Sequence, residues 1–169
     1  TPEGRYTLAE DSKTSDGGTV SIRIDATELK QTELKVRESE ALFRAFIDNS
    51  PARITLVDTA GRFLLVNKAY AKFANRTEEE IVGSSNREIA WLATESLAEN
   101  EQNDRDVIEQ KKTIQVERII NRGGKNETVW EVAKFPIFNE SGEVTGVGGF
   151  GTNVTDRNTS EKLLSLSEN

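Results

Sequence analysis

Apolar and polar residues form two short runs near the middle of the chain that predict a β-hairpin. The apolar runs at 54–57 and 63–66 flank the segment DTAG at 58–61, in which Asp and Gly are turn formers. Asn67 follows the second run, and its short side chain can accept hydrogen bonds from the free N–H groups at the start of a helix. We therefore expect a strand, a turn, a strand and a capped helix that carries Tyr70 inward.

Similar patterns predict the remaining strands. Residues 113–120 and 129–137 surround the turn RGGK, and residues 144–152 follow the turn NESG. Several short helices are expected between the two strands of the central hairpin and these three strands. An antiparallel five-stranded sheet with helices on one face satisfies this order, which is an α+β fold.

The longest predicted helix begins at Thr27, a candidate N-cap, and ends before Pro51. Apolar residues recur along it at heptad spacing, but two of the intervening positions are polar. The seam predicts a helix that forms a homodimer, and the alternative is a solvated connector that docks only its C-terminal end on its own domain. The seam residues are Leu29, Val36, Phe43 and Phe46.

Two acidic regions follow the central hairpin. The segment TEEE at 77–80 predicts the start of a short helix, and residues 86–110 predict helix in two pieces. Leu97 and Val107 share a face of the second piece with Asn100 and Asp104, so we expect this helix to pack loosely. Solvated helix ends are the simplest interpretation of the acidic groups at 78–80 and 104–106.

An additional hairpin precedes the long helix. Residues 6–9 and 19–24 alternate in polarity around the turn DGG at 16–18. Two strands alone are marginal in water, so this hairpin needs a cover for its apolar side chains. These are Leu8, Val20, Ile22 and Ile24.

Composition limits the classes of function. The 169 residues support one modest core with extensions, and a net charge of -7 argues against a nucleic-acid partner. No apolar run is long enough for direct membrane insertion, and the absence of Cys fits a reducing compartment such as the cytoplasm. The chain begins with Thr1 and contains no Met, so we expect it to be a piece of a longer protein.

The sequence also contains little that resembles a catalytic site. Without His or Cys there is no thiolate metal site, Cys nucleophile or His general base. The segment GVGGFG at 146–151 matches GxGxxG, but it lies within a predicted strand and lacks a βαβ context, so a dinucleotide site is not expected. We expect a chain that is not an enzyme.

Four segments together resemble a PAS sensor domain. They are VNKAYAKFANRTEEEIVG, a Gly-Gly hairpin, FPIFNESGEVTGV and NVTDRN, in family order and spacing over about residues 40–158. The N-terminal SDGGTVSIRIDATELK resembles the last hairpin of a preceding PAS domain. It includes the family's Asp-x-Thr exit motif at 25–27, and the second copy has Asn153 in place of the acid, followed by Thr155.

The resemblance implies a division of the chain into four parts. Residues 1–26 would be the end of a truncated PAS domain, 27–47 a connector helix, 48–155 the PAS domain and 156–169 the start of a C-terminal signalling helix. It also implies a cytoplasmic sensory module of a multidomain, bacterial-type signalling protein. A membrane anchor and a histidine kinase or cyclic-dinucleotide output domain are expectations for that parent protein. The alternative is a ligand-free PAS domain that dimerises and spaces its neighbours.

A ligand pocket, if present, is expected between the sheet and the helices at 86–110. No cofactor is expected, because haem ligation through His and a Cys-linked flavin are both absent; the identity of any small-molecule ligand stays open. Trp130 is expected to face the glycines of the last strand and fill the space of a noncovalent flavin. The implied pocket residues are Thr55, Val57, Tyr70, Ile89, Trp91, Leu97, Trp130, Val132, Val147, Gly149 and Gly151.

Overall fold

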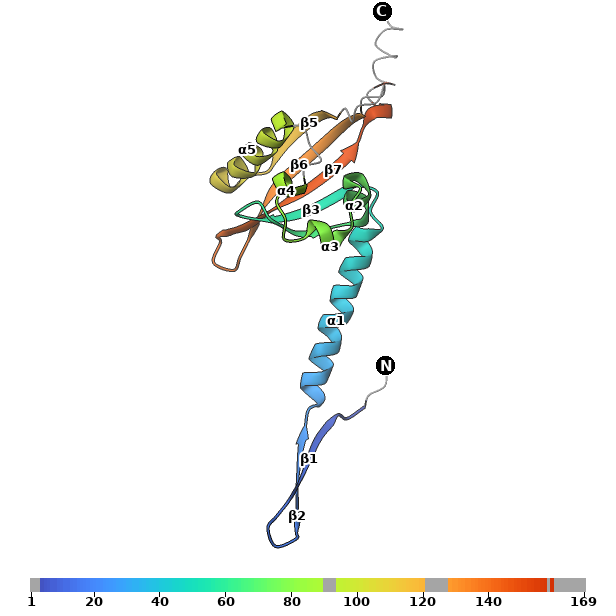
Figure 1. The fold of residues 1–169 in the computed structure, drawn as a ribbon, viewed down its shortest axis with the longest axis vertical. Coiled ribbons are helices and arrows are strands. Elements are labelled where there is room, and N and C mark those ends of the chain that lie inside the picture. The colour runs from blue at the N-terminus through green and yellow to red at the C-terminus, as the bar shows by residue number, and fades with distance from the viewer. Residues whose placement is uncertain (1–3, 90–93, 121–127, 158, 160–169) are drawn as a thin grey trace, which may run out of the picture. The chain divides into compact units, whose positions relative to one another are not determined.

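The computed structural model describes residues 4–89, 94–120, 128–157 and 159 (Figure 1). The chain divides into two compact units, residues 1–46 and 47–169. Trp91 and the predicted Gly-Gly turn at 122–125 lie outside the described residues, as does most of the predicted C-terminal helix.

The first unit contains a hairpin and most of a long helix. Strands β1 (Thr7–Lys13) and β2 (Thr19–Asp25) pair antiparallel, and α1 (Thr27–Asp48) follows. The first strand is longer than predicted, because pairing continues from Thr7 opposite Asp25 to Lys13 opposite Thr19. Thr27 as the N-cap was wrong: Lys30 N–H donates to the Ala26 carbonyl, so the helix starts one residue earlier, and the Thr27 hydroxyl accepts from Tyr6 N–H.

The second unit contains the predicted antiparallel five-stranded sheet, in the order β4-β3-β7-β6-β5. The central hairpin is confirmed, with Asp58 accepting from the N–H groups of Ala60 and Arg62 in its turn. The five strands are β3 (Arg53–Asp58), β4 (Phe63–Val66), β5 (Ile114–Ile120), β6 (Thr128–Phe138) and β7 (Val144–Asn153).

Within the described part of the chain, four helices connect β4 to β5 along one face of this sheet (Figure 1). Thr77 caps α3 with Glu80 in a reciprocal capping box, as the acidic segment predicted. Of the described helices, none combines the length and hydropathy needed to cross a membrane. The bounds are α2 (Lys68–Ala74), α3 (Glu78–Ile81), α4 (Asn86–Ile89) and α5 (Thr94–Gln110).

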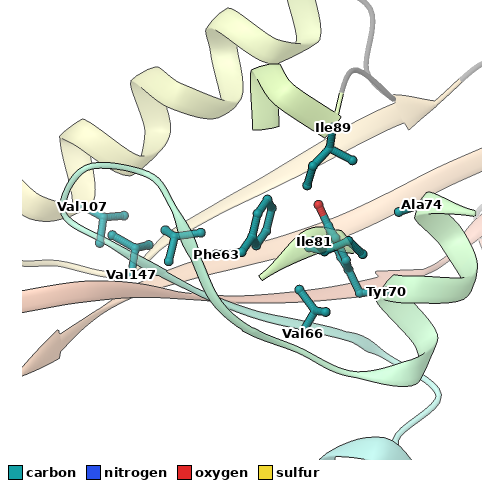
Figure 2. Close-up of a cluster of buried hydrophobic side chains, with 9 residues drawn as sticks. Phe63, Val66, Tyr70, Ala74, Ile81, Ile89, Val107 and Val147 are labelled. Atoms are coloured by element: carbon teal, nitrogen blue, oxygen red, sulfur yellow. The ribbon is translucent and has the colours of Figure 1, made fainter. Parts of the chain in front are cut away.

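The apolar core lies where the sheet meets these helices (Figure 2). Val66, Ile81 and Val107 are fully buried, and the rings of Phe63 and Tyr70 pack with their centroids 5.4 Å apart. Burying a side chain of this kind stabilises the fold by about 1.5–3 kcal/mol. The core therefore joins β4, α2, α3 and α5 into one packed layer.

The amide of Asn67 joins three backbone segments beneath this core. Its Nδ2 donates to the carbonyls of Ile47, in the last turn of α1, and Ala52, at distances of 2.8 and 2.9 Å. Its Oδ1 accepts from Ile54 N–H in β3 and Tyr70 N–H in α2, at 3.0 and 3.1 Å. The predicted N-cap is confirmed, and the same side chain also fixes where β3 begins.

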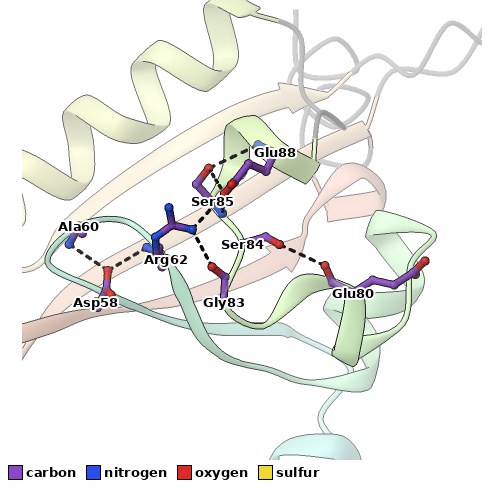
Figure 3. A network of polar contacts seen from close by, with 8 residues as sticks. All are labelled: Asp58, Ala60, Arg62, Glu80, Gly83, Ser84, Ser85 and Glu88. Carbon is purple, nitrogen blue, oxygen red and sulfur yellow. Dashed lines mark hydrogen bonds and ion pairs between the residues drawn. The ribbon is translucent and has the colours of Figure 1, made fainter.

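A polar network joins the central hairpin to the loop between α3 and α4 (Figure 3). Arg62 Nη1 donates to the Gly83 carbonyl at 2.8 Å and contacts Glu88 at 3.2 Å. Glu88 in turn accepts from the N–H and hydroxyl of Ser85. These exposed contacts set the path of the loop, whereas the energy of the fold comes mainly from the buried layer.

Replacing Asn67 with Ala should strongly destabilise the second unit, because two carbonyls and two N–H groups lose their partner in a side chain that is only 1% exposed. Unsatisfied buried groups cost about 1–3 kcal/mol each, and we expect a loss of about 3–5 kcal/mol in the free energy of unfolding. Urea denaturation measures this loss in the free energy of unfolding. Thr77→Ala, which removes one exposed cap, is the control and should cost about 1 kcal/mol. Equal losses in both variants would contradict the role assigned to Asn67.

Candidate functional site

A cavity of about 700 Å³ lies between the inner face of the sheet and α5. Ligand pockets for small molecules have volumes of about 300–1,000 Å³. Its wall combines aliphatic side chains with an unusual number of charged ones. Seven residues of the predicted pocket line it: Thr55, Val57, Tyr70, Val132, Val147, Gly149 and Gly151.

Three other residues of the predicted pocket lie elsewhere in the described fold. Ile89 and Leu97 are buried among core side chains and are not part of the cavity wall. Trp130 also lies outside the wall and packs against Phe73, with ring centroids 5.4 Å apart. Ligand binding by the predicted residues stays a prediction.

The strand alternation on which the pocket prediction depends is present in β6. Val132 and Lys134 line the cavity, while Glu131, the residue before Val132, is exposed and pairs with Arg157 on the surface. Residues two apart on a strand share a face, so the inner face of β6 carries the even-numbered residues.

The glycines of β7 leave room for two side chains of β3. A Cβ on Gly149 would clash with the Thr55 hydroxyl, and one on Gly151 would lie 3.2 Å from the Arg53 guanidinium. We expected Trp130 to occupy this space. Instead Arg53 and Thr55 occupy it, because they are the direct partners of the two glycines across the β3–β7 ladder.

Arg53 is a buried cation, only 6% exposed, and two aromatic rings hold its side chain. Its guanidinium carbon lies 3.9 Å from the ring centroid of Phe73 and 3.5 Å from that of Trp130. A cation on an aromatic face gains about 0.5–2 kcal/mol, more when water is excluded. These ring contacts hold the side chain in the wall of the cavity, which Arg53 lines.

Lys134 forms a buried ion pair at the α5 side of the cavity. Its Nζ donates to the Asn100 carbonyl at 2.9 Å and to the Asp104 carboxylate at 2.5 Å, and both charged side chains are largely buried. Burial lowers the pKa of the Lys134 ammonium, whereas the Asp104 carboxylate opposes that shift. The interpretation of Asp104 as a solvated helix end was wrong, because its side chain faces the cavity.

The mixed face of helix α5 borders the cavity, and its loose packing stays a prediction. Val107 is fully buried, and the polar residues Asn100 and Asp104 on the same face line the cavity. A helix that borders a cavity presents polar groups inward where they have a buried partner. The pattern that seemed poorly amphipathic therefore marked the cavity wall.

Arg118 adds a third cation from β5. Its side chain is 10% exposed, and its Nη2 lies 3.9 Å from the Glu99 carboxylate, whose side chain is 57% exposed. Sequence reasoning missed Arg53, Arg118 and Lys134. The alternation that pointed Thr55 and Val132 inward also points Arg53 and Lys134 inward, so the same argument could have predicted these two cations.

The N-terminal exit motif includes three hydrogen bonds that join Thr27 and Ala26 to Asp25 and Tyr6. Thr27 N–H donates to the Asp25 carboxylate at 3.0 Å, Tyr6 N–H donates to the Thr27 hydroxyl at 3.0 Å, and Ala26 N–H donates to the Tyr6 carbonyl at 2.9 Å. The Thr27 hydroxyl, followed by its N–H, lowers the pKa of the Asp25 carboxyl by hydrogen bonding to the charged form.

The second motif repeats the same three contacts. Thr155 N–H donates to Asn153 Oδ1 at 3.0 Å, Val129 N–H donates to the Thr155 hydroxyl at 2.9 Å, and Val154 N–H donates to the Val129 carbonyl at 2.8 Å. Asn153 therefore replaces the acid with a neutral acceptor in the same geometry. This likeness of the two hairpins agrees with residues 1–26 being a PAS hairpin, which stays a prediction.

The predicted seam of α1 lies on an exposed surface. Leu29, Val36, Phe43 and Phe46 are exposed by 70%, 52%, 56% and 75%, respectively. Ile47 at the end of the helix is buried. The apolar residues of the β1–β2 hairpin are similarly exposed: Leu8, Val20, Ile22 and Ile24.

Comparison with family models matches residues 47–159 to the PAS fold. The chain belongs to the PAS family. Its PAS domain is therefore the second unit, and its cavity lies between the PAS sheet and α5. The α+β fold inferred from the four sequence segments is confirmed.

Several proteins resemble this PAS chain. A curated relative, the methanogenesis regulatory histidine kinase FilI of Methanothrix harundinacea, is 24% identical over 128 residues, which are 76% of this chain and 14% of FilI. The Vibrio cholerae VqmA dimer has a TM-score of 0.61 and 25% identity over 71% of this chain and 52% of VqmA. The PAS domain of Bordetella pertussis BvgS has a TM-score of 0.61 and 23% identity over 78% of this chain and 98% of that domain.

The Lys134–Asp104 pair should make stability depend on pH once Asp104 is neutralised. Asp104→Asn leaves a buried ammonium without its counter-charge, which costs about 3 kcal/mol at pH 7. The folded pKa of Lys134 lies below its ordinary value of 10.5, so the unfolded chain binds more protons between the two values. The stability of this variant should therefore rise as the pH increases from 7 toward 10.5.

Urea denaturation at several pH values measures this dependence. Lys134→Met, combined with Asp104→Asn, is the control, because it removes the titrating group and should abolish the rise. A single variant Asp104→Asn whose deficit stays constant from pH 7 to 10 would contradict the buried pair.

Proposed function

We propose that this chain is a sensory module that detects a small molecule in its PAS cavity and passes the change to its flanking helices. The observation that supports it is the cavity of about 700 Å³. A PAS domain that only spaces its neighbours needs a filled core and has no use for such a volume, because empty space in a core costs stability.

The contacts around the cavity provide a route to the preceding helix. Arg53 in the cavity wall is adjacent to Ile54, whose N–H donates to Asn67. Asn67 in turn donates to the carbonyl of Ile47 in the last turn of α1. A ligand that moves the start of β3 would therefore act on the end of α1 through one buried amide.

A second route leads to the C-terminal end of the domain. Trp130 holds Arg53 on the inner face of β6, and the N–H of the preceding residue, Val129, donates to the Thr155 hydroxyl in the exit motif. Movement of β6 would change the hydrogen bond on which the start of the following helix depends. Small shifts or rotations of helices are a common means of transmission between domains.

The parent context is proposed from the relatives. FilI is a histidine kinase, and the chain spans 14% of its length, so an output domain of that kind is an expectation for the parent. We propose a cytoplasmic location and no catalytic activity within this chain. The VqmA dimer is described in the absence of its target DNA, and the net charge of -7 here disfavours DNA as a partner of this chain.

Homodimerisation through α1 is the second part of the proposal. Four large apolar side chains along one seam of α1 are more than half exposed, and contact between two copies would remove them from water. VqmA, which resembles this chain, is described as a dimer. A ligand-free spacer that dimerises is the alternative function, and the cavity argues against it.

Filling the cavity should abolish small-molecule binding without unfolding the domain. Val132 lines the cavity and is half-buried, so Val132→Phe would occupy part of the volume. Mass spectrometry of compounds released from the denatured wild-type protein should find a bound small molecule. The variant should release at least tenfold less of this compound per protein molecule. Glu131→Phe adds the same ring on the outer face and should retain it. An empty wild-type protein that also binds nothing from a cell extract would contradict the sensor function.

Charges placed on the seam should convert dimer to monomer. Val36→Glu and Phe43→Glu each place a carboxylate where two apolar surfaces would meet, and we expect at least a tenfold increase in the dimer dissociation constant. Sedimentation velocity at micromolar concentration measures it. Lys35→Glu changes charge beside the seam and should remain dimeric. A wild-type chain that is monomeric at millimolar concentration would remove the dimer from the proposal.

A further inference from the structure

We infer that the ligand of this cavity is an uncharged molecule with a carboxamide, lactam or similar group, which combines a hydrogen-bond donor and an acceptor, on an apolar body. The inference rests on the proposed sensor function and specifies the chemical class that the sensor detects. It follows from polar groups of the cavity wall that form no hydrogen bond within the described part of the chain.

Asn86, the first residue of α4, carries the main observation. It lines the cavity and is only 7% exposed, yet no hydrogen bond joins its side-chain amide to any residue that the structure describes. Buried polar side chains almost always have a partner, because a group without one costs stability. A carboxamide has two N–H donors and one carbonyl acceptor. Its complement is a ligand group that also donates and accepts, such as a second amide.

A second neutral group projects from the floor of the cavity. Thr55 on β3 and Lys134 on β6 are both cross-strand partners of Gly149, so the three residues form one row across the sheet. A Cβ on Gly149 would clash with the Thr55 hydroxyl, which therefore leans over the glycine. This hydroxyl lines the cavity without a hydrogen bond to the described residues, and it can donate or accept.

Lys134 provides a donor from the other side of Gly149. An ammonium group has three N–H donors. Two of them bond to the Asn100 carbonyl at 2.9 Å and the Asp104 carboxylate at 2.5 Å, and the third has no acceptor among the described residues. Neighbouring strands are about 4.8 Å apart, so about 10 Å separates the backbones on the two sides of the glycine. A ligand oxygen over Gly149 would therefore have donors on both sides.

The charges of the cavity wall favour an uncharged ligand. Among the described residues, three cations and three acids line the cavity, so their formal charges cancel. A charged group beside the Lys134–Asp104 pair would meet a like charge, whichever sign it carried. Burying a charge without its own partner is costly, whereas an amide needs only hydrogen bonds. The six charged residues are Arg53, Glu99, Asp104, Glu117, Arg118 and Lys134.

An apolar row lies beside the polar one. Val57 pairs with Val147 on β7 and with Phe63 on β4, and all three line the cavity. Val57 is two residues from Thr55 along the same strand, which is about 7 Å. This distance suits a body of one ring or a short aliphatic chain, attached to the group that lies over Gly149.

Equilibrium dialysis of the whole chain against matched probes tests this class. The probes are phenylacetamide, phenylacetate, phenethylamine and ethylbenzene, which share a ring and differ in charge and hydrogen bonding. Mass spectrometry measures the retained probes, together with any molecule released from the protein as purified. We expect at least tenfold preference for the amide over the other three, and a released molecule that is uncharged at neutral pH.

Variants of similar volume connect that preference to the two neutral groups. Asn86→Leu and Thr55→Val should each weaken retention of phenylacetamide by at least tenfold and leave ethylbenzene unchanged. Because the Asn86 amide has no partner to lose, Asn86→Leu should not lower the urea midpoint of the ligand-free chain, which separates binding from a structural role. Asn103→Leu is the control: its Nδ2 is also buried without a hydrogen bond, but outside the cavity wall, so it should bind as wild type.

The outcomes separate the ligand class from the sensor function. Preference for the acid, the amine or the hydrocarbon, release of a charged molecule, or amide binding unaffected by Asn86→Leu would overturn the ligand class and leave the sensor function standing. Retention and release of no compound would overturn both.

Discussion

The buried amide of Asn67 is the interaction on which the PAS domain depends. Its two donor and two acceptor contacts join the end of α1, the residue before β3, the start of β3 and the first turn of α2. Each of these backbone groups would otherwise be buried without a partner or need water. An aliphatic residue of similar size would satisfy none of them, so packing alone could not replace this side chain. The apolar layer above it supplies most of the energy, while Asn67 fixes how the chain enters the sheet.

The cavity is a consequence of what the inner face of the sheet carries. Glycines at 149 and 151 remove side chains from the middle strand, and Arg53 and Thr55 from the neighbouring strand lie in the vacated space. Cations enter this interior because each has a specific support. The aromatic rings hold Arg53, and Asp104 holds Lys134, so neither has to be desolvated without compensation.

The two exit motifs show how similar geometry can differ electrically. Both use a threonine whose hydroxyl accepts from a strand and whose N–H donates to a side chain two residues earlier. Asp25 is an ionised acceptor, and Asn153 is neutral. Charge-assisted hydrogen bonds are roughly twice as strong as neutral ones, so the second motif is the weaker of the two. A weaker junction at the end of the PAS sheet suits a position where a sensor must change state.

The sequence by itself determined the order of the elements and their faces. The signals are local: turn residues at 58–61 and 139–142, the N-cap Thr77 before an acidic first turn, and the alternation along the strands. Such a local signal determines a hairpin, the start of a helix or the face on which a side chain lies. Seven of the predicted pocket residues line one cavity for this reason.

Only the tertiary structure decided which of these side chains meet. Arg53, Arg118 and Lys134 come from three strands, and their buried positions depend on partners far away in sequence: Trp130, Glu99 and Asp104. A charged residue on a strand is interpreted as solvent-facing unless its partner is known. The packing of α5 on the sheet supplies the partners of Arg118 and Lys134, and β6 supplies that of Arg53. For the same reason Asp104 looked like a solvated helix end, and Asn67 looked like a simple cap. Local pattern therefore specified the framework, and the long-range contacts specified the chemistry inside it.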